Sequence, residues 1–215
     1  MAKAAQQPRV TKRSRGGAIP YHHGSLDEAL LIAAERVLIR DGLAGLTLRA
    51  VAREAGVSHA APRHHFGDLA GLVSELAAMS FRRLNARIAA AGTTGKTPTE
   101  RRLAQVRAHI AYAQDQPAMY GLMFRIERLD MSRPSLQEAV NASFAGLADE
   151  CVPGHPEKRP LSFDHAAAVA AAWSLAHGFS VLLLDGRLGK IIAQSQKGVT
   201  TEALLEAMLR KSVTQ

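Results

Sequence analysis

Cysteine is almost missing from this sequence. Cys151 is the single cysteine among 215 residues, so no disulfide can form within the chain. A chain without disulfides is typical of a reducing compartment, and we therefore expect a cytoplasmic protein. Aromatic residues are also scarce, at 5%, whereas hydrophobic residues reach 47% and include many alanines. This composition favours packed helices over pleated strands and excludes global disorder.

Long hydrophobic runs are missing as well. The longest, from Ala166 to Ala176, is stopped by His165 and His177 and falls short of the ~20 apolar residues that span a bilayer. The first residues are polar and basic, without the apolar segment of a secretory signal. We expect neither a membrane-spanning segment nor a membrane partner.

Negative charge is lacking at the start of the sequence, because no acidic residue precedes Asp27. Five basic residues occupy this stretch: Lys3, Arg9, Lys12, Arg13 and Arg15. They account for most of the formal net charge of +8. Residues 1–20 are therefore expected to form a basic, disordered arm. It is either a solvated tail or a segment drawn to nucleic-acid phosphates, and charge alone favours neither.

The motifs of common enzymes do not occur. The segment GTTGKT, residues 92–97, resembles the end of a phosphate-binding loop, but Ala90 stands where that loop needs its first glycine and Pro98 follows it. There is no G-x-S-x-G nucleophile elbow. Adjacent histidines, such as His64 and His65, point apart on a helix, and no carboxylate or thiol lies nearby at ligand spacing. We expect no enzyme activity, no cofactor and no metal site.

Helical periodicity is the main positive signal. Apolar residues recur every three or four positions, and capping boxes that begin at Ser25, Thr97 and Ser135 mark helix starts. No stretch alternates apolar and polar residues as a strand would. The pattern predicts an all-α fold with about eight or nine helices.

Two predicted helices are unusually apolar. Residues 162–185 are apolar on nearly every side, and residues 201–210 carry a stripe of leucine and methionine. Such helices either complete the core of one chain or pack against a second copy. A chain of 215 residues has little room to bury both. We therefore favour a homodimer in which these segments form a four-helix interface.

Residues 47–66 have the pattern of two short helices joined by a tight turn. Thr47 is the expected N-cap of the first helix, Gly56 supplies the turn, and Ser58 is the expected N-cap of the second. Pro62 is then the fourth residue of the second helix, where it removes only one hydrogen bond. Two short helices around a glycine turn predict a helix-turn-helix, whose second helix enters the major groove of DNA.

The segment around this unit, residues 21–77, resembles the N-terminal DNA-binding domain of TetR/AcrR-type transcriptional regulators. The first helix, the helix-turn-helix and the start of a long fourth helix are in register. Farther along, W-x-x-x-H-G at residues 173–178 resembles a motif of one C-terminal subfamily, the WHG subfamily. The segment QPAMYGLMF, residues 116–124, resembles a helix of the same subfamily that follows the pocket entrance.

The resemblance implies an N-terminal three-helix helix-turn-helix domain at residues 21–68. It implies a helical-bundle domain for ligand binding and dimerisation at residues 69–215. The expected function is a repressor that binds a near-palindromic DNA operator as a homodimer and is released by a small-molecule effector. The competing interpretation is a helical small-molecule-binding protein whose DNA-binding head has decayed.

The second helix of the helix-turn-helix and the start of the long fourth helix each depart from the family pattern at one residue. Arg63 stands where the family usually has tyrosine, and Leu69 where it usually has lysine. Arginine can still bind phosphate and leucine cannot, so we expect altered affinity and not loss of DNA binding. The resemblance implies these DNA contacts: His22, His23, Thr47, Arg49, Ser58, His59, Ala60, Arg63 and His64. It implies these pocket residues: Met119, Met123, Phe124, Trp173, His177 and Phe179.

Overall fold

The structure, a computed structural model, describes residues 23–152, 154 and 160–213. Within these residues it contains ten α-helices, one short 3-10 helix and no strand. The all-α fold expected from the sequence is confirmed. The predicted arm at residues 1–20 lies outside the described residues.

The helices outnumber the expected eight or nine, and three of them are short. The short ones are α3 (Ala61–Phe66), α6 (Pro117–Met123) and α9 (Leu188–Ala193). Helices of six or seven residues are too brief to show a helical period in the sequence. The other elements are α1 (His23–Gly45), α2 (Leu48–Ala55), α4 (Leu69–Gly92), α5 (Pro98–Asp115), η1 (Ile126–Arg128), α7 (Pro134–Cys151), α8 (Phe163–Leu184) and α10 (Thr201–Val213).

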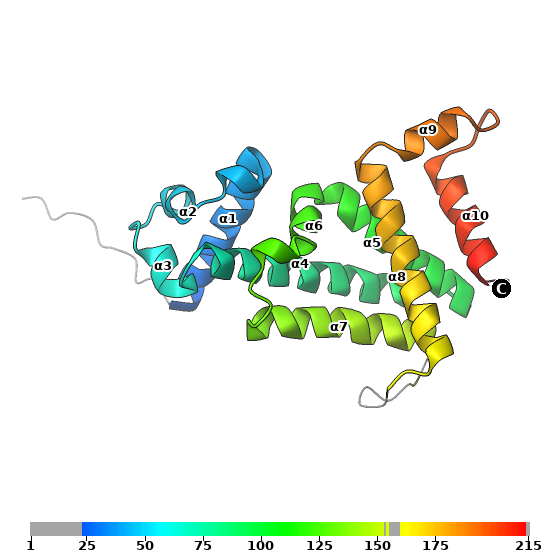
Figure 1. Ribbon diagram of the computed structural model, residues 1–215, viewed down its shortest axis with the longest axis horizontal. Helices are drawn as coiled ribbons and strands as arrows, with labels where there is room; N and C mark the ends of the chain where they lie inside the picture. The colour runs from blue at the N-terminus through cyan, green and yellow to red at the C-terminus, as the bar shows by residue number, and fades with distance from the viewer. Residues whose placement is uncertain (1–22, 153, 155–159, 214–215) are drawn as a thin grey trace, which may run out of the picture.

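The helices form an elongated molecule (Figure 1). Helices α1 to α3 lie at one end, which we call the head. Helix α4 runs away from the head, and α7 lies alongside it. Helix α8 packs against α5 and α7, while α9 and α10 lie at the opposite end.

Local chemistry explains where several helices begin. The capping box at Thr97 is confirmed: its hydroxyl accepts from the N–H of Glu100 at 3.1 Å, and the Glu100 carboxylate accepts from the N–H of Thr97 at 3.0 Å. The capping predictions at Ser25 and Ser135 are wrong, because α1 and α7 begin before them. A proline at the first position starts α7, since the first N–H of a helix has no partner within it.

Three clusters of buried residues follow one another along the molecule. The first joins the head to α4 and α6 around Leu30, Val51 and Leu72. The second lies between α4, α5, α6 and α7. The third, between α5, α8, α9 and α10, is the smallest of the three. The core is therefore thickest near the head and thinnest at the far end.

Helix α8 leaves large apolar side chains uncovered. Phe163 is 87% exposed and Trp173 is 40% exposed, and Val181, Leu182 and Leu184 are exposed as well. By length and composition, α8 is the one helix in the described part of the chain that could cross a membrane, although 22% of its most apolar stretch is buried within the molecule. A single copy of the chain does not cover this face. We call it the α8 face.

Candidate functional site

Helices α2 and α3 form a compact unit at the free end of the head (Figure 1). Thr47 caps α2 as predicted, because its hydroxyl accepts from the N–H of Ala50 at 3.1 Å. Gly56 ends α2 with a φ of 68°, a left-handed conformation that glycine adopts without steric cost. The N–H of Gly56 returns to the carbonyl of Arg53 at 3.2 Å, which closes the helix.

The second helix begins later than predicted. Helix α3 starts at Ala61 with Ala60 at the N-cap position, and no side chain caps it. The prediction that Ser58 is the N-cap is therefore wrong. As the fourth helical residue, Pro62 would leave the Ser58 carbonyl without its helical donor; as the second residue, it lies where no N–H is needed. The Ser58 carbonyl instead accepts from the N–H of Ala61 at 3.0 Å.

Most of the predicted DNA contacts lie on this unit. The exposed ones are Thr47, Arg49, Ser58, His59, Ala60, Arg63 and His64. His22 lies outside the described residues, and His23 is the first residue of α1. Val51 of α2 and Phe66 of α3 are buried in the first cluster. The polar side chains therefore stand outside a closed core, where guanidinium, imidazole and hydroxyl groups can meet phosphates or base edges.

Two neighbouring residues have other roles. Nδ1 of His65 contacts the carboxylate of Asp27 on α1, so its side chain links α3 to the rest of the head. Leu69 is the first residue of α4 and is 37% exposed. Its side chain has no hydrogen-bond donor, and the N–H of Gly71 in the same turn is already bound by the Asp68 carboxylate at 2.8 Å.

A second polar group lies in the body of the molecule. The hydroxyl of Tyr120 on α6 is 2.9 Å from Nε2 of His109 on α5 and 2.9 Å from Nδ1 of His177 on α8. The Phe124 ring lies beside that of His177, with 4.2 Å between centroids. A hydroxyl has one proton, so Tyr120 donates to one imidazole and accepts from the N–H of the other. We call His109, Tyr120 and His177 the polar trio.

Burial sets the protonation of the polar trio. It lowers the pKa of His109 to about 4, and the nearby His177 adds to the lowering. Burial also lowers the pKa of His177 and raises the pKa of Tyr120 to about 12. All three groups are therefore neutral at pH 7. Within the described residues, no group of three or more His, Cys, Asp or Glu side chains is placed to hold a metal ion.

The six predicted pocket residues fall into different surroundings. His177 belongs to the polar trio, the Phe124 ring lies against it, and Met123 is buried in the second cluster, which also contains Tyr120. Trp173 lies on the α8 face instead, where its ring packs edge-on against Phe144 at 5.1 Å between centroids. Three of the six, Met123, Phe124 and His177, therefore lie in or near the polar trio, and Trp173 lies away from it.

The other two predicted pocket residues belong to separate cores. Met119 is buried in the first cluster and Phe179 in the third. The sequence reasoning missed His109 and Tyr120. A signal was present for His109, because it lies between Val106 and Ile110 on an apolar helix face, where a polar side chain needs a buried partner.

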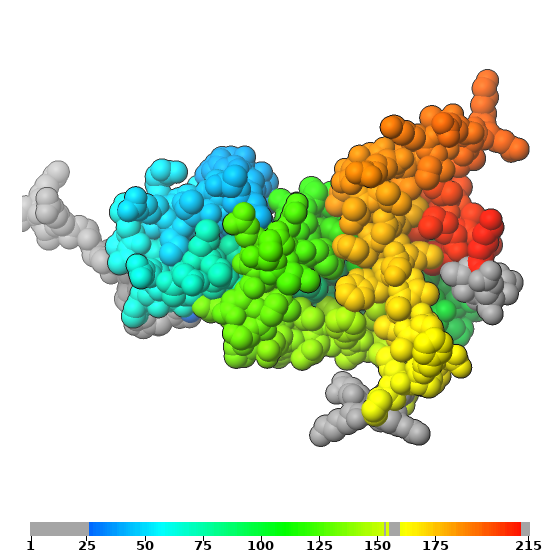
Figure 2. Space-filling model, viewed as in Figure 1, coloured from blue at the N-terminus to red at the C-terminus, as the bar shows by residue number. Residues whose placement is uncertain are grey.

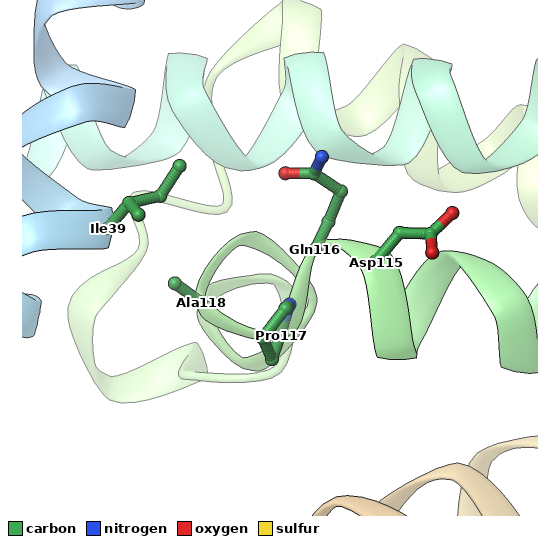
Figure 3. Close-up of a pocket in the computed structure, with 5 residues that line it drawn as sticks. All are labelled: Ile39, Asp115, Gln116, Pro117 and Ala118. Atoms are coloured by element: carbon green, nitrogen blue, oxygen red, sulfur yellow. The ribbon is translucent and has the colours of Figure 1, made fainter.

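A small surface hollow lies where the end of α1 meets the start of α6 (Figure 3). Its volume is about 140 Å³, and its lining is Ile39, Asp115, Gln116, Pro117 and Ala118. A neighbouring hollow of about 220 Å³ shares the last two of these residues. None of the six predicted pocket residues lines either hollow, so the predicted pocket stays a prediction.

Family models match two parts of the chain. Residues 30–76 match the model for bacterial regulatory proteins of the tetR family. Residues 103–211 match the model for the tetracyclin repressor-like C-terminal domain. The first match contains the helix-turn-helix, and the second contains the polar trio and the α8 face. No significant match was found among curated protein sequences.

Solved structures resemble the chain over most of its length. A protein of unknown function from Rhodococcus sp. RHA1 is 30% identical, with a TM-score of 0.72 over 90% of this chain and 96% of that one. PfmR, a TetR family transcriptional regulator from Thermus thermophilus, is 17% identical, with a TM-score of 0.58 over 86% of this chain and 97% of that one. FadR from Bacillus subtilis, solved in complex with stearoyl-CoA, is 12% identical, with a TM-score of 0.61 over 87% of this chain and 97% of that one. The last two likenesses concern the fold alone.

Proposed function

Because the chain belongs to the TetR family of bacterial regulatory proteins, we propose that it is a transcriptional repressor that binds its operator as a homodimer and is released by a small molecule. Membership of this family makes the chain a DNA-binding transcription regulator with a helix-turn-helix and a ligand-binding C-terminal domain. The proposal adds the repressor role, the paired operator, the WHG subfamily and a cytoplasmic location. It also adds the domain boundaries at residues 21–68 and 69–215.

The observation that carries the proposal is the exposed polar surface of α2 and α3 over a closed apolar core. In this arrangement α3 enters the major groove, where His59, Ala60 and His64 contact bases. Thr47, Arg49 and Arg63 contact the backbone and set affinity and register. Two such heads on one operator lie ~34–36 Å apart, or at a closely related spacing.

The α8 face supports the homodimer. Its exposed aromatic and aliphatic side chains would be covered by the same face of a second copy, as in an isologous four-helix interface with α10. The effector then favours a conformer in which the two heads no longer match successive grooves. Such coupling is reciprocal, so the operator weakens effector binding as much as the effector weakens operator binding.

The test of the proposed function is selection of genomic DNA fragments by the purified protein, followed by footprinting at two salt concentrations. We expect a protected near-palindrome whose binding weakens steeply as salt rises, because phosphate contacts release counterions. Binding without sequence preference would contradict the operator and favour a small-molecule-binding protein with a decayed head.

A matched pair of arginine variants sharpens this test. Arg63→Ala removes an exposed guanidinium from α3 and should weaken operator binding and reduce its salt dependence. Arg187→Ala removes an exposed guanidinium near α9, 71% exposed and far along the chain from the head, and should change neither. Equal effects of the two substitutions would mean that binding is not made through α3.

The polar trio supports a particular class of effector. We propose that the effector binds beside the polar trio, whose neutral imidazoles and neutral phenol offer hydrogen bonds without a charge to balance an anion. We therefore infer an effector with an apolar body and an uncharged polar group, such as a hydroxyl, beside Phe124. The probes are n-alkanols and n-alkanoates of equal chain length at pH 7.

We expect the alkanols to raise the thermal midpoint and release the operator at lower concentration than the alkanoates. The variant Tyr120→Phe should remove this preference, because it deletes the hydroxyl that joins the two histidines. Alkanoates that bind as well as alkanols in both proteins would exclude the polar trio as the site that selects the effector.

A further inference from the structure

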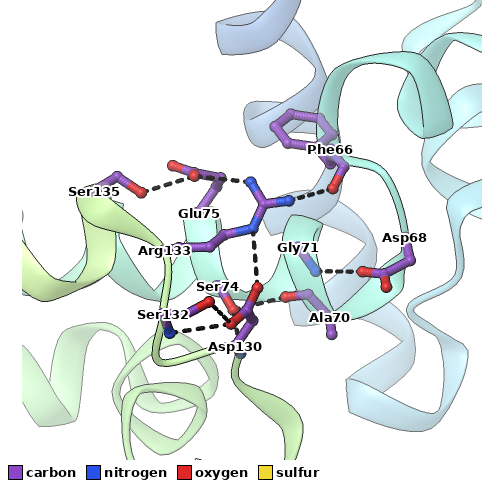
Figure 4. Close-up of polar contacts among 10 residues, drawn as sticks. All are labelled: Phe66, Asp68, Ala70, Gly71, Ser74, Glu75, Asp130, Ser132, Arg133 and Ser135. Carbon is purple, nitrogen blue, oxygen red and sulfur yellow. Dashed lines mark hydrogen bonds and ion pairs between the residues drawn. The ribbon is translucent and has the colours of Figure 1, made fainter.

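Arg133 reaches from the turn before α7 to the end of α3 (Figure 4). Its Nη2 donates to the carbonyl of Phe66, the last residue of α3, at 2.5 Å. Carbonyls at the end of a helix have no partner within it, so a donor from elsewhere stabilises the helix end. In the described part of the chain, this is the one hydrogen bond that joins α3 to any residue beyond α4.

The site is shaped to admit the guanidinium. A Cβ atom at Gly71 would lie 2.1 Å from the Phe66 carbonyl oxygen and 2.2 Å from Nη2 of Arg133. Gly71 is in the first turn of α4 and is buried, so no side chain there could turn away to solvent. The absence of a side chain at Gly71 lets the end of α3 and the guanidinium pass directly over α4.

Further contacts hold the turn at residues 130–133 to α4. Nη1 of Arg133 donates to the Glu75 carboxylate at 3.3 Å, and the hydroxyl of Ser135 donates to the same oxygen at 2.7 Å. The N–H of Asp130 donates to the buried hydroxyl of Ser74 at 2.8 Å. Nε of Arg133 is buried without a hydrogen-bond partner and lies 3.8 Å from the Asp130 carboxylate.

The same turn is linked to the polar trio at both of its ends. Before it, η1 and Phe124 follow α6, and the Phe124 ring rests against His177. After it, α7 packs on α8, which carries His177.

We propose that Arg133 is a positioning residue that holds the end of α3 on α4 through the carbonyl of Phe66. The inference rests on the proposed function, because it takes α3 as the helix that reads DNA. Arg133 itself does not touch DNA. Without Arg133, the carbonyl of Phe66 loses its donor and α3 loses its fixed orientation for the groove.

The experiment uses the full chain, with the operator that the wild-type protein selects and unrelated DNA of equal length. The variants are Arg133→Gln, Arg133→Lys, Gly71→Ala and the double variant Gly71→Ala/Arg133→Gln. Arg128→Ala is the control, because Arg128 is exposed in the neighbouring η1. Each protein is measured for DNA affinity at several salt concentrations and for backbone hydrogen exchange.

We expect Arg133→Gln to weaken operator binding by roughly tenfold. Affinity for unrelated DNA and its salt dependence should not change, because no phosphate contact is lost. Arg133→Lys should restore part of the loss, since an ammonium can still donate to the Phe66 carbonyl. Gly71→Ala should reproduce Arg133→Gln, and the double variant should bind no more weakly than either single variant, because all of them break the same contact.

Hydrogen exchange separates the inference from the proposed function. Faster exchange confined to residues 66–74 in Arg133→Gln supports the positioning role even if the wild-type protein selects no operator, an outcome that would contradict the proposed function alone. Wild-type exchange there in Arg133→Gln would overturn the inference. Operator affinity equal to that of the wild type, or an equal loss for operator and unrelated DNA, would overturn it as well.

Discussion

Large apolar side chains are mostly buried at the head of the molecule and largely exposed on α8 toward the other end. Where the head meets α4, Leu30, Val51 and Leu72 are completely buried, and in the head α2 and α3 expose arginine, histidine and small polar residues. At the far end, the third cluster is small, and α8 exposes aromatic and aliphatic side chains. Figure 2 shows that much of α8, coloured yellow to orange, lies at the surface of the molecule. The head is thus closed within one chain, whereas the α8 face has the composition of an interface core.

This contrast suits the two ends to different tasks, DNA binding at the head and pairing of two copies at the α8 face. A closed core can hold polar side chains in fixed positions for DNA, and an open apolar face favours pairing with an identical face. If this division is correct, the same kind of substitution should have different consequences at the two ends.

The largest effect is expected from a charge on the α8 face. Leu182→Asp, at a side chain that is 39% exposed, should convert the proposed dimer to a monomer, because a buried unpaired carboxylate is costly. Operator affinity should then fall by at least about a hundredfold, since the second head no longer binds in the same molecule. Sedimentation velocity and DNA titration measure the two changes.

The control for this substitution lies in the head. Ile39 on α1 is 59% exposed, so Ile39→Asp makes the same chemical change to an exposed apolar residue where the core is closed. It should leave the dimer intact. Dissociation by Ile39→Asp, or an intact dimer in Leu182→Asp, would contradict the contrast between the two ends.

Truncation of a buried leucine should also differ between the ends. Leu72→Ala in the first cluster should lower the free energy of unfolding by an amount near the top of the usual range of about 2–5 kcal/mol. Leu205→Ala in the third cluster should cost less, because its surroundings can collapse more easily, and should weaken the dimer through α10. Urea denaturation and the dimer dissociation constant test this, and equal losses with an unchanged dimer would refute it.

Acid should destabilise the body of the molecule through the buried His109. An unfolded histidine binds a proton at a pKa near 6.5, whereas burial holds the pKa of His109 at about 4 in the folded protein. Between these values the unfolded state binds more protons, so stability falls as pH drops, by roughly 3 kcal/mol in total.

The comparison for this prediction uses two histidine variants. His109→Gln keeps a hydrogen-bonding side chain beside Tyr120 but cannot titrate, so its stability should fall less between pH 7 and pH 4. His59→Gln, at an exposed position just before α3, should follow the wild-type profile. Urea midpoints across this pH range give the answer, and identical profiles for all three proteins would exclude His109 as the source.

The sequence predicts the parts of the molecule that depend on local rules. The predictions for Thr47 and Gly56 are correct, because a helix cap and a left-handed turn are determined by interactions within three or four residues. The prediction of Ser58 as an N-cap is wrong for a reason that is also local. Pro62 has no N–H to donate, so α3 begins at Ala61, where Pro62 is the second helical residue. The apolar character of α8 was equally visible, since it needs only composition and period.

Contacts between distant residues are the part that the sequence does not show. Tyr120 is 11 residues from His109 and 57 residues from His177, so only the packing of three helices reveals the polar trio. Arg133 and Phe66 are 67 residues apart, and nothing in the local pattern marks either one. The predicted pocket lining is dispersed for a related reason: apolar residues at helical spacing serve separate cores as readily as one cavity.

The smallest effect expected is the loss of a helix cap, and it separates stability from DNA binding. Thr47→Ala should cost about 1 kcal/mol of stability, because the N–H of Ala50 loses its acceptor. Thr97→Ala removes the same kind of cap from α5 and should cost a similar amount. Only Thr47→Ala should also weaken operator binding, since Thr47 begins the helix-turn-helix, and Thr47→Ser should restore both properties. If Thr97→Ala weakens operator binding as much as Thr47→Ala, the effect comes from overall stability and not from the head.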